Sequence, residues 1–411
     1  MNNTPATYLR KLRVWGWRGV LSYLRIRAED VRNRRELLAN ARQHRGVKPG
    51  RGITVVAPLS MKYSNSKTVR DFVWALKAAG IPFQTFDTNR RPEVPAEDYA
   101  GILTPKEDFV ATKYDHVVEM FKSPFPEGLV PHRARIAFWE GKSGMLEVFP
   151  YLAKPDPVIA MSDFNAEHFR RELPMSTPVF KIVYPLPLDV AGFDPPDAVR
   201  ARFEIPSDAF AVFYNFDLGS YYRKNPEAAI RAFAEAFRDE PRARLVFKLK
   251  WAAEHADKVA RMEALAAELG IGVQLVLVRD YLSRRDLHGL ANACNCYFSP
   301  HRAEGFGIGI AEAMLLSKPV VATDWSSTTE FCRPEHSIPV PYRMVPVKPG
   351  EYFTSMKEWA EIDVPAAAAA LRRLFESPAL RAELGQKARA FVLDHFSVAA
   401  VKRDVEAFLD A

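Results

Sequence analysis

The sequence predicts an α/β protein of two domains, each built on a parallel sheet that helices cover. Three observations support this prediction. A chain of 411 residues is longer than one hydrophobic core of ordinary size requires. Short apolar runs alternate with segments of helical period twice, from residue 51 onward and again from residue 209. Residues 184–210, between these two stretches, contain five prolines and little periodicity, which is typical of a linker.

The first alternating stretch starts with a strand, a helix and a second strand, an order that implies parallel pairing. Apolar runs predict strands at residues 52–60, 81–87, 135–140 and 157–162. Helical period predicts helices at residues 66–80 and 163–173. We expect Asp163 to be the N-cap of the second helix. Between residues 90 and 130 the pattern weakens, because proline and charged residues are frequent.

The second alternating stretch continues the same pattern. Strands are predicted at residues 209–216, 244–250, 273–278, 296–300 and 319–323. Helices are predicted between them, at residues 225–237, 258–270, 283–293 and 308–317. Two similar α/β domains joined by a linker make a bilobal enzyme with a cleft, and nucleotide ligands bind at the carboxyl ends of such strands.

Composition excludes several classes of protein. Apolar residues make up 48% of the chain and charged residues 26%, as in a soluble globular protein. No run approaches the roughly 18 apolar residues that span a bilayer. The N-terminal sequence has no apolar core of the secretory type, so we expect a cytoplasmic protein. Three cysteines cannot form a disulfide framework, and Cys294 and Cys296 are better explained by core packing than by metal binding.

The formal charge of +7 is concentrated near the N-terminus. Residues 1–51 hold 13 Lys and Arg and 3 Asp and Glu, whereas the remainder of the chain is slightly acidic. A nucleic-acid-binding protein would spread basic and aromatic residues over a folded face, so we expect no nucleic acid partner. An apolar stripe of helical spacing runs through the basic segment, at Trp17, Val20, Leu21, Leu24, Ala28 and Val31. Residues 1–46 therefore either bind an anionic membrane surface or pack on the protein's own first domain.

A glycine-rich stretch, EGFGIGIAEAM at residues 304–314, has two interpretations. Its three glycines, Gly305, Gly307 and Gly309, look like a dinucleotide-binding turn, with Asp324 where a ribose-binding acid would follow. That turn has to follow a strand directly, yet four residues separate Gly305 from the strand that ends at Pro300. In the second interpretation the important residues are the acids that bracket the glycines, Glu304 and Glu312.

Residues 299–331, SPHRAEGFGIGIAEAMLLSKPVVATDWSSTTEF, resemble the donor-site segment of family 4 glycosyltransferases. The mark of that family is a Glu, seven residues and a second Glu, the spacing of Glu304 and Glu312. Residues 216–237, FDLGSYYRKNPEAAIRAFAEAF, resemble the phosphate-binding turn of a bacterial polysaccharide branch with the sequence RKNP. Residues 358–389 match the C-terminal helices of that branch. The first half of the chain matches weakly, at residues 138–140 and 161–169.

The resemblance implies the two-lobed fold called GT-B, in which two Rossmann-like parallel-sheet domains face each other across a cleft. The expected parts are a basic helical extension at residues 1–50, an acceptor domain at 51–190, a linker at 191–208, a donor domain at 209–395 and a C-terminal helix at 396–411. In this arrangement the C-terminal helix can cross back to the first domain.

The resemblance also implies roles for the motif residues. Glu312 holds the ribose of a nucleotide sugar, Glu304 contacts the donor sugar, and Arg223 and Lys224, just before the helix at 225–237, meet the diphosphate charge. Glycines at 305 and 307 let the backbone approach the donor closely, and the helix that begins near Ile308 offers unpaired N–H groups to phosphate. The expected donor-binding positions are Glu312, Gly305, Phe306, Gly307, Ile308, His301, Arg279 and Tyr281.

Several assignments have two possible answers. His301 either faces the donor or is a structural loop histidine, and residues 326–329 either face the donor sugar or form an ordinary polar turn. Many relatives place an Arg where this chain has Leu218, so Lys248 or Lys250 is a candidate for a second cation. Glu140, at the end of an expected strand, is an acceptor-side candidate. His116 and His132 are available for a histidine role near the reacting sugar, but neither lies in a clear motif.

The sequence thus predicts a metal-independent retaining glycosyltransferase without a cofactor. It would move a hexose or deoxyhexose from a nucleoside diphosphate to a surface polysaccharide, lipopolysaccharide or lipid-linked glycan. The resemblance favours GDP-mannose as the first donor to test, followed by UDP- and dTDP-sugars. A lipid-linked acceptor would suit a peripheral position on the inner face of the cell membrane. The alternatives are a dinucleotide-dependent oxidoreductase and a non-catalytic sugar-binding protein of the same fold.

Overall fold

The computed structural model describes Arg25 and residues 28–62, 64–120, 124–141, 143, 145–154, 156–187, 192–352 and 356–411. Four positions of the apolar N-terminal stripe, Trp17, Val20, Leu21 and Leu24, lie outside these residues. The chain divides into two compact units. The first extends to Ala137 and includes Val405–Ala411, and the second is Phe138–Asp404. The domain boundaries expected from the sequence stay predictions.

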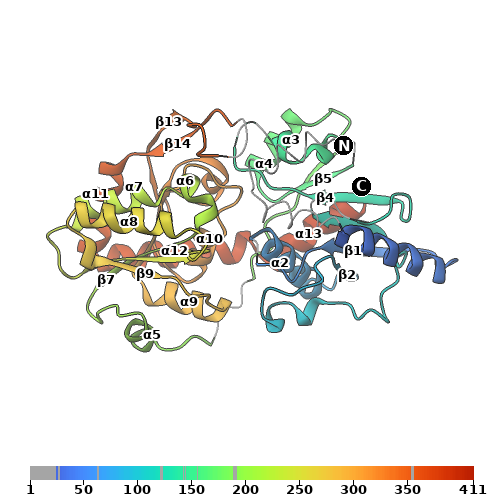
Figure 1. Ribbon diagram of the computed structural model, residues 1–411, viewed down its shortest axis with the longest axis horizontal. Coiled ribbons are helices and arrows are strands. Elements are labelled where there is room, and N and C mark those ends of the chain that lie inside the picture. Colours follow the sequence, from blue (N-terminus) through green and yellow to red (C-terminus); the bar gives the residue numbers. More distant parts are fainter. Residues whose placement is uncertain are drawn as a thin grey trace. The chain divides into compact units, whose positions relative to one another are not determined.

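In the first unit, residues 28–43 are helical and lead into a parallel α/β arrangement (Figure 1). Its elements are β1 (Gly50–Ala57), α2 (Ser64–Ala78), β2 (Phe83–Asp87), the 3-10 helices η1 (Ala96–Asp98) and η2 (Ala100–Ile102), β3 (Tyr114–Met120) and β4 (His132–Ile136). The next elements along the chain, which belong to the second unit, are α3 (Met145–Val148), η3 (Pro150–Ala153), β5 (Val158–Ala160), α4 (Asp163–Glu172) and β6 (Val179–Lys181). Six of these strands form one sheet in the order β2-β1-β3-β4-β5-β6.

Strand β3 lies in the stretch where the sequence pattern is weak, because the strand carries charged side chains. Glu119 on β3 is fully buried, and its Oε2 lies 3.4 Å from Arg133 Nη1 and 3.8 Å from Arg135 Nη1. A buried carboxylate is tolerated only when cations or hydrogen bonds compensate it. The compensating arginines lie on the neighbouring strand β4, and no local pattern in the sequence predicts their contact with Glu119.

The helix at residues 28–43 packs on the first unit. Leu37 is fully buried in a core with Val56, Phe109, Val117 and Phe125. Asn40 fixes the helix further, because its side chain donates to Phe109 O and accepts from Ala111 N, each over 2.8 Å. The later part of the basic segment is therefore structural, although Val31 is 51% exposed.

The second sheet has the strand order β12-β11-β10-β7-β8-β9, and its neighbouring strands pair in parallel. Its strands are β7 (Phe210–Asp217), β8 (Ala243–Lys250), β9 (Leu275–Val278), β10 (Cys296–Ser299), β11 (Val320–Thr323) and β12 (Ile338–Val340). The strand order reverses beside β7, the first strand, as in Rossmann sheets. Loops after β7 and β10 therefore border the crevice where ligands of such sheets bind.

Helices cover this second sheet (Figure 1). They are α5 (Pro196–Arg202), η4 (Leu218–Ser220), α6 (Tyr221–Lys224), α7 (Pro226–Phe237), α8 (Ala256–Glu268), η5 (Gly272–Gln274), α9 (Arg284–Ala293), α10 (Ile308–Leu315), η6 (Ser326–Glu330), α11 (Val364–Glu376) and α12 (Pro378–His395). The last helix is α13 (Val398–Leu409), whose residues from Val405 onward belong to the first unit. A separate antiparallel hairpin consists of β13 (Tyr342–Pro346) and β14 (Glu358–Ile362). Residues 358–362 were expected to start the C-terminal helices, and the structure corrects this: they form β14.

Helix α5 lies inside the stretch expected to be a linker, and one of its side chains ties the stretch to the second sheet. Arg200 is buried, and its guanidinium donates to the carbonyl oxygens of Ala293, Pro206, Ser207 and Ala209 and to Asn295 Oδ1, over 2.9 to 3.0 Å. Asn295 Oδ1 also accepts from Ala211 N over 2.8 Å. The end of the proline-rich stretch is therefore fixed to the strand region by a buried cation.

Two local predictions were wrong. The N-cap of α4 is Ser162 and not Asp163, because Ser162 Oγ accepts from Asn165 N over 3.1 Å. Strand β4 ends at Ile136, so Glu140 lies in the loop that follows and not at a strand end.

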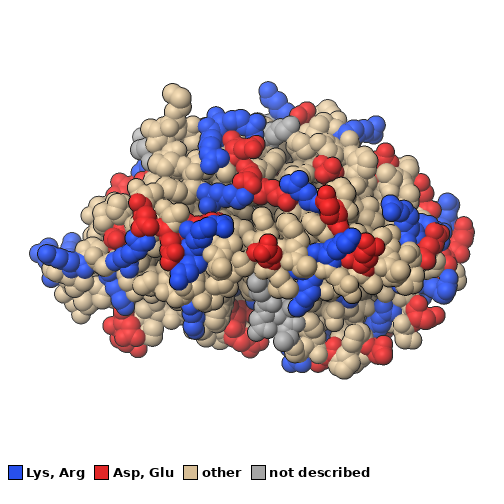
Figure 2. All heavy atoms as spheres, turned by 180° about the vertical axis from the view of Figure 1, so that it is seen from behind, with Lys and Arg blue, Asp and Glu red and all other residues tan. Residues whose placement is uncertain are grey.

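No helix among the described residues is both long and apolar enough to cross a membrane. On the face drawn in Figure 2, basic and acidic side chains are interspersed.

Candidate active site

The turn after β7 places two cations at the crevice of the second sheet. Asp217 Oδ1 accepts from Gly219 N over 2.7 Å and starts the turn, and Asn225 ends α6 in the left-handed region at φ 55°. Arg223 and Lys224 thus lie in the last turn of the short helix α6. They also lie just before α7, as the sequence predicted. The C-terminus of α6 favours cations at this position.

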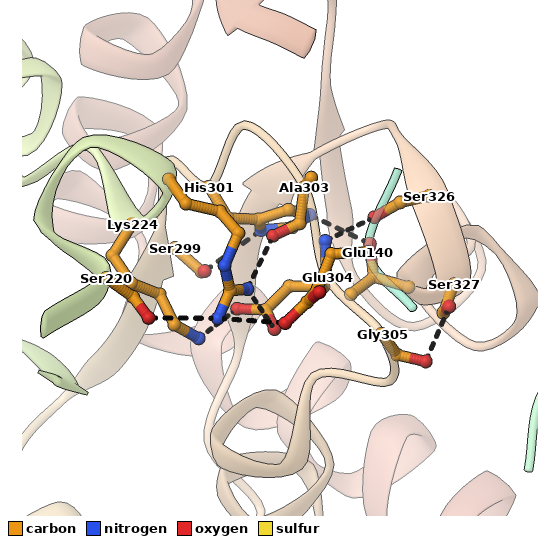
Figure 3. Close-up of polar contacts among 12 residues, drawn as sticks. Glu140, Ser220, Lys224, Ser299, His301, Ala303, Glu304, Gly305, Ser326 and Ser327 are labelled. Carbon is orange, nitrogen blue, oxygen red and sulfur yellow. Dashed lines mark hydrogen bonds and ion pairs between the residues drawn. The ribbon is translucent and has the colours of Figure 1, made fainter. Parts of the chain in front are cut away.

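The loop after β10 carries the first acid of the Glu-containing motif. Glu304 N donates to Ser326 Oγ over 2.9 Å, and Gly305 O accepts from Ser327 Oγ and from Asn165 Nδ2, each over 2.8 Å (Figure 3). Serine and asparagine side chains from η6 and α4 therefore hold this loop in place. The polar residues at 326–328 are buried and act as the bracing turn, which was one of the two alternatives for them.

His301 belongs to the same bracing. It is fully buried, its Nδ1 lies 3.0 Å from Ser299 Oγ, and its Nε2 lies 3.2 Å from Trp325 O and 3.1 Å from Thr328 Oγ1. Burial lowers the pKa of His301 to about 4, so the ring is neutral near pH 7. These contacts fit the alternative of a structural loop histidine.

Glu304 stands at the centre of an ion cluster. Its Oε1 contacts Lys224 Nζ, its Oε2 lies 3.3 Å from Arg223 Nη1, and Arg223 Nη2 lies 3.4 Å from Glu140 Oε1. Figure 3 shows Glu140, Lys224 and Glu304 converging from three separate segments. Burial raises the pKa of Glu304, but Lys224 and Arg223 outweigh this and lower it to about 2. Glu304 is therefore ionised at neutral pH.

Glu312, the second acid, is buried on α10, where its Oε1 lies 3.2 Å from His288 Nε2. His288 comes from α9 and is itself 3% exposed. The sequence analysis missed this contact, because a histidine within a helical pattern carries no motif. Its position facing the second acid is visible only in the packing of α9 against α10.

Two glycines of the motif are required by close packing within the protein, which the sequence did not predict. Gly307 has φ +99°, and a Cβ there would lie 2.7 Å from Thr328 Cγ2. A Cβ at Gly309 would lie 2.4 Å from Tyr297 Oη. A Cβ at Gly305 would make only ordinary contacts, the nearest at 3.6 Å. Close packing within the protein thus explains Gly307 and Gly309 without a ligand.

Other predicted donor residues lie apart from the ion cluster or inside the core. Phe306 is buried and stacks on Tyr184 with ring centroids 4.1 Å apart. Ile308 opens α10 as expected. Arg279 follows β9, is exposed and forms an ion pair with Glu263. Tyr281 is 52% exposed.

The remaining candidate residues have other surroundings. Lys248 is buried with its Nζ donating to Leu249 O over 2.8 Å, and burial lowers its pKa to about 8. Lys250 Nζ lies 5.6 Å from the ring centroid of Trp251. His116 and His132 stack 4.5 Å apart near the amino ends of β3 and β4, whereas ligands bind at the carboxyl ends. Over the described ranges, no group of three or more His, Cys, Asp or Glu could hold a metal ion.

The β13–β14 hairpin, which the sequence did not predict, contacts both loops of the site. Arg302 Nε donates to Glu361 Oε2 over 2.6 Å, and Asn225 Nδ2 donates to Glu361 Oε1 over 3.1 Å. Tyr352, in the segment between the two strands, donates its hydroxyl to Glu140 Oε2 over 3.1 Å. A single side chain on β14, Glu361, therefore connects the cation turn with the acid loop.

Comparison with known proteins agrees with this arrangement. Residues 200–338 match the family described as Glycosyl transferases group 1. This part of the chain is a glycosyltransferase domain. No curated protein sequence matches the glycosyltransferase.

Three solved structures illustrate the fold of this glycosyltransferase. Sucrose-phosphate synthase from Thermosynechococcus elongatus is 19% identical with a TM-score of 0.63, and the match covers 88% of this chain and 98% of that one. HepE from Anabaena, solved with UDP and glucose, is 15% identical with a TM-score of 0.61, over 88% and 100%. A glycosyltransferase from Rickettsia africae is 14% identical with a TM-score of 0.62, over 88% and 98%. These likenesses confirm the predicted GT-B fold, while family 4 and the RKNP branch stay predictions.

Proposed function

We propose that the protein is a retaining, metal-independent glycosyltransferase that takes a hexose or deoxyhexose from a nucleoside diphosphate. One observation carries the proposal. Arg223 and Lys224, after β7, meet Glu304, after β10, at the point where the strand order of the second sheet reverses. A crevice of that kind binds nucleotides, and two cations beside the loop that leads into α10 suit a diphosphate.

The chemistry of the donor matches the charges at this site. Arg223 and Lys224 bind the diphosphate, and Glu312 accepts hydrogen bonds from the ribose hydroxyls, as the resemblance implies. When the diphosphate takes its place on the cations, Glu304 is available to accept from hydroxyls of the donor sugar. The carboxylates are assigned to sites where two hydroxyl donors are expected. The cations are assigned to the site where phosphate oxygens are expected.

Transfer needs the bond between the sugar and the diphosphate to break, with positive charge on the sugar and negative charge on the leaving group. Arg223 and Lys224 stabilise the leaving diphosphate, and buried cations do this better than solvent because they are already oriented. The remaining task is to hold the acceptor hydroxyl in line with the sugar carbon. The resemblance of residues 299–331 to family 4 glycosyltransferases implies retention of the anomeric configuration, and NMR of the product measures it directly.

The donor and acceptor are proposed from the comparisons. HepE, which shares the fold, has been solved with UDP-glucose, so UDP-glucose is tested beside GDP-mannose and dTDP-sugars. WaaG, a glycosyltransferase involved in lipopolysaccharide biosynthesis, shares the fold at a TM-score of 0.54. We propose a surface polysaccharide or lipid-linked glycan as the acceptor.

A thermal-shift and hydrolysis panel tests the proposal. Nucleoside diphosphates at 100 times their Kd should stabilise the protein by about 2.7 kcal/mol, and the matching nucleotide sugar should release its diphosphate in the presence of EDTA. The rival oxidoreductase predicts stabilisation by NAD(H) instead. The classic strand order suits a dinucleotide, but the turn after the first strand β7 reads DLGSYYRKN and lacks the glycine fingerprint. Stabilisation by NAD(H) alone would overturn the proposal, and binding without hydrolysis would indicate a sugar-binding protein.

We also propose that the part of residues 1–46 that precedes the packed helix at 28–43 brings the protein to the cytoplasmic face of the membrane. The support is the basic charge of the segment and its apolar stripe. Anionic vesicles should bind the protein at low salt and release it at high salt, because exposed charges are screened. Removal of residues 1–24 leaves the packed helix at 28–43 in place, and it should abolish vesicle binding while donor hydrolysis continues. Vesicle binding that survives this deletion contradicts the proposal.

A further inference from the structure

Glu140 lies beside Arg223, although it belongs to the loop that follows β4. Its Oε1 is 3.4 Å from Arg223 Nη2, and its Oε2 accepts a hydrogen bond from the Tyr352 hydroxyl over 3.1 Å. The Glu140 side chain is 25% exposed and Arg223 is 9% exposed. Glu140 thus reaches a buried cation from the more solvent-accessible side, as a ligand does.

Both terminal nitrogens of the Arg223 guanidinium have partners in this arrangement. Nη1 donates to Ala303 O over 2.9 Å and lies 3.3 Å from Glu304 Oε2, while Nη2 lies 3.3 Å from Ser220 Oγ and contacts Glu140. Burial lowers the pKa of Arg223, but Glu140 and Glu304 outweigh this and raise it above its ordinary value. A buried guanidinium requires such compensation. The two carboxylates therefore supply the negative charge that a diphosphate would bring.

Tyr352 holds Glu140 in this position and is itself anchored. Its ring lies edge-on to Trp139 at 6.3 Å and to Trp359 at 6.2 Å, and both tryptophans are 1% exposed. Trp359 belongs to β14, whose neighbour Glu361 is bonded to both loops of the site. The position of Glu140 is therefore set by the hairpin and does not depend on the exposed surface.

We propose that Glu140 is a stand-in anion, which occupies Arg223 until the donor diphosphate displaces it, and that Tyr352 is the residue that positions it there. The proposal rests on the function proposed above, because it assumes that Arg223 binds phosphate. It replaces the acceptor-side role expected for Glu140 with a donor-side one. Two like charges cannot share one guanidinium edge without repulsion, so binding of the diphosphate and departure of Glu140 are coupled.

Charge removal at Glu140 tests this coupling. Glu140→Gln keeps the size of the side chain and one of its two acceptor oxygens, and it removes the charge that competes with phosphate. Calorimetric titration with inorganic pyrophosphate, UDP and GDP should show affinity higher than in the parent protein by on the order of tenfold, which corresponds to about 1.4 kcal/mol. Affinity for uridine and guanosine should not change, because neither carries phosphate.

Two further variants complete the experiment. Tyr352→Phe loosens the hold on Glu140 without a change of charge, and it should raise pyrophosphate affinity by a smaller factor. Glu172→Gln removes one exposed carboxylate at the end of α4 and controls for the general loss of a negative charge. Its pyrophosphate affinity should equal that of the parent protein.

The outcomes separate the two proposals. Unchanged or weaker pyrophosphate binding by a folded Glu140→Gln protein overturns the stand-in role and leaves the proposed function intact. An equal gain for Glu172→Gln also overturns it, because the effect would then be one of net charge. Failure of the parent protein and of both site variants to bind any diphosphate overturns the proposed function itself.

Discussion

The ion cluster around Glu304 gives a quantitative prediction about stability. Burial raises the pKa of this carboxyl, yet Lys224 and Arg223 move it from 4.5 to about 2. At roughly 1.4 kcal/mol for each pH unit, the folded protein gains about 3 kcal/mol from ionised Glu304. Because the folded pKa lies below the ordinary value, this contribution is fully present above about pH 4.5 and is lost as the pH falls through about 2.

Glu304→Gln should therefore unfold more easily than the parent protein by about 3 kcal/mol at pH 7. The difference should narrow as the pH falls below 4.5, since the parent then loses its advantage. Urea unfolding at pH 7, 5, 4 and 3 measures the free energy of both proteins, and Glu268→Gln, at an exposed acid on α8, is the matched control. A pH 7 difference below about 1 kcal/mol, or a difference that does not change with pH, would refute the reasoning.

Four further predictions follow from the site. Lys224→Ala should weaken binding of nucleoside diphosphates but not of nucleosides in calorimetry, and equal loss for both would remove its phosphate role. Glu312→Ala should weaken binding of a nucleoside diphosphate far more than of its 2′,3′-dideoxy analogue, and equal loss would remove the ribose assignment. Gly309→Ala places a Cβ 2.4 Å from Tyr297 Oη, so it should cost about 1–3 kcal/mol in urea unfolding, and an unchanged midpoint would show that this region relaxes. Chelators should not inhibit transfer, and recovery of activity on adding Mg²⁺ would contradict metal independence.

The sequence predicted the part of the site that depends on strand ends. The cation turn and the acid loop each follow a strand of the second sheet, so their meeting at one edge follows from parallel pairing. The resemblance to family 4 glycosyltransferases assigned Arg223, Lys224 and Glu304 to one donor site, and in the structure the three side chains contact one another. The fold class was predictable for the same reason, because alternation of strand and helix patterns does not depend on particular contacts.

The rest depended on contacts between distant residues. Tyr352 and Glu140 are 212 positions apart, and neither carries a motif. Strand β3 was not predicted, because charged residues such as Glu119 are more common in loops than in buried strands. The arginines that compensate the buried Glu119 lie on the next strand. Glu361 fixes the hairpin to the site through Arg302 and Asn225, a role that depends on tertiary packing. The residues that compensate a buried charge can be identified only when the positions of both partners in the fold are known.

The buried guanidinium of Arg200 bears on how the second lobe can be produced alone. A recombinant fragment cut where the sheet begins, at Ala209, would lack it, and the carbonyl oxygens of Ala293 and Ala209 would lose this donor. Each buried acceptor left without a partner costs about 1–3 kcal/mol, which is a large share of the stability of an ordinary domain. A fragment that starts at Asp194 keeps α5 and its arginine, and is the better starting point for crystallisation or for binding measurements on the isolated lobe.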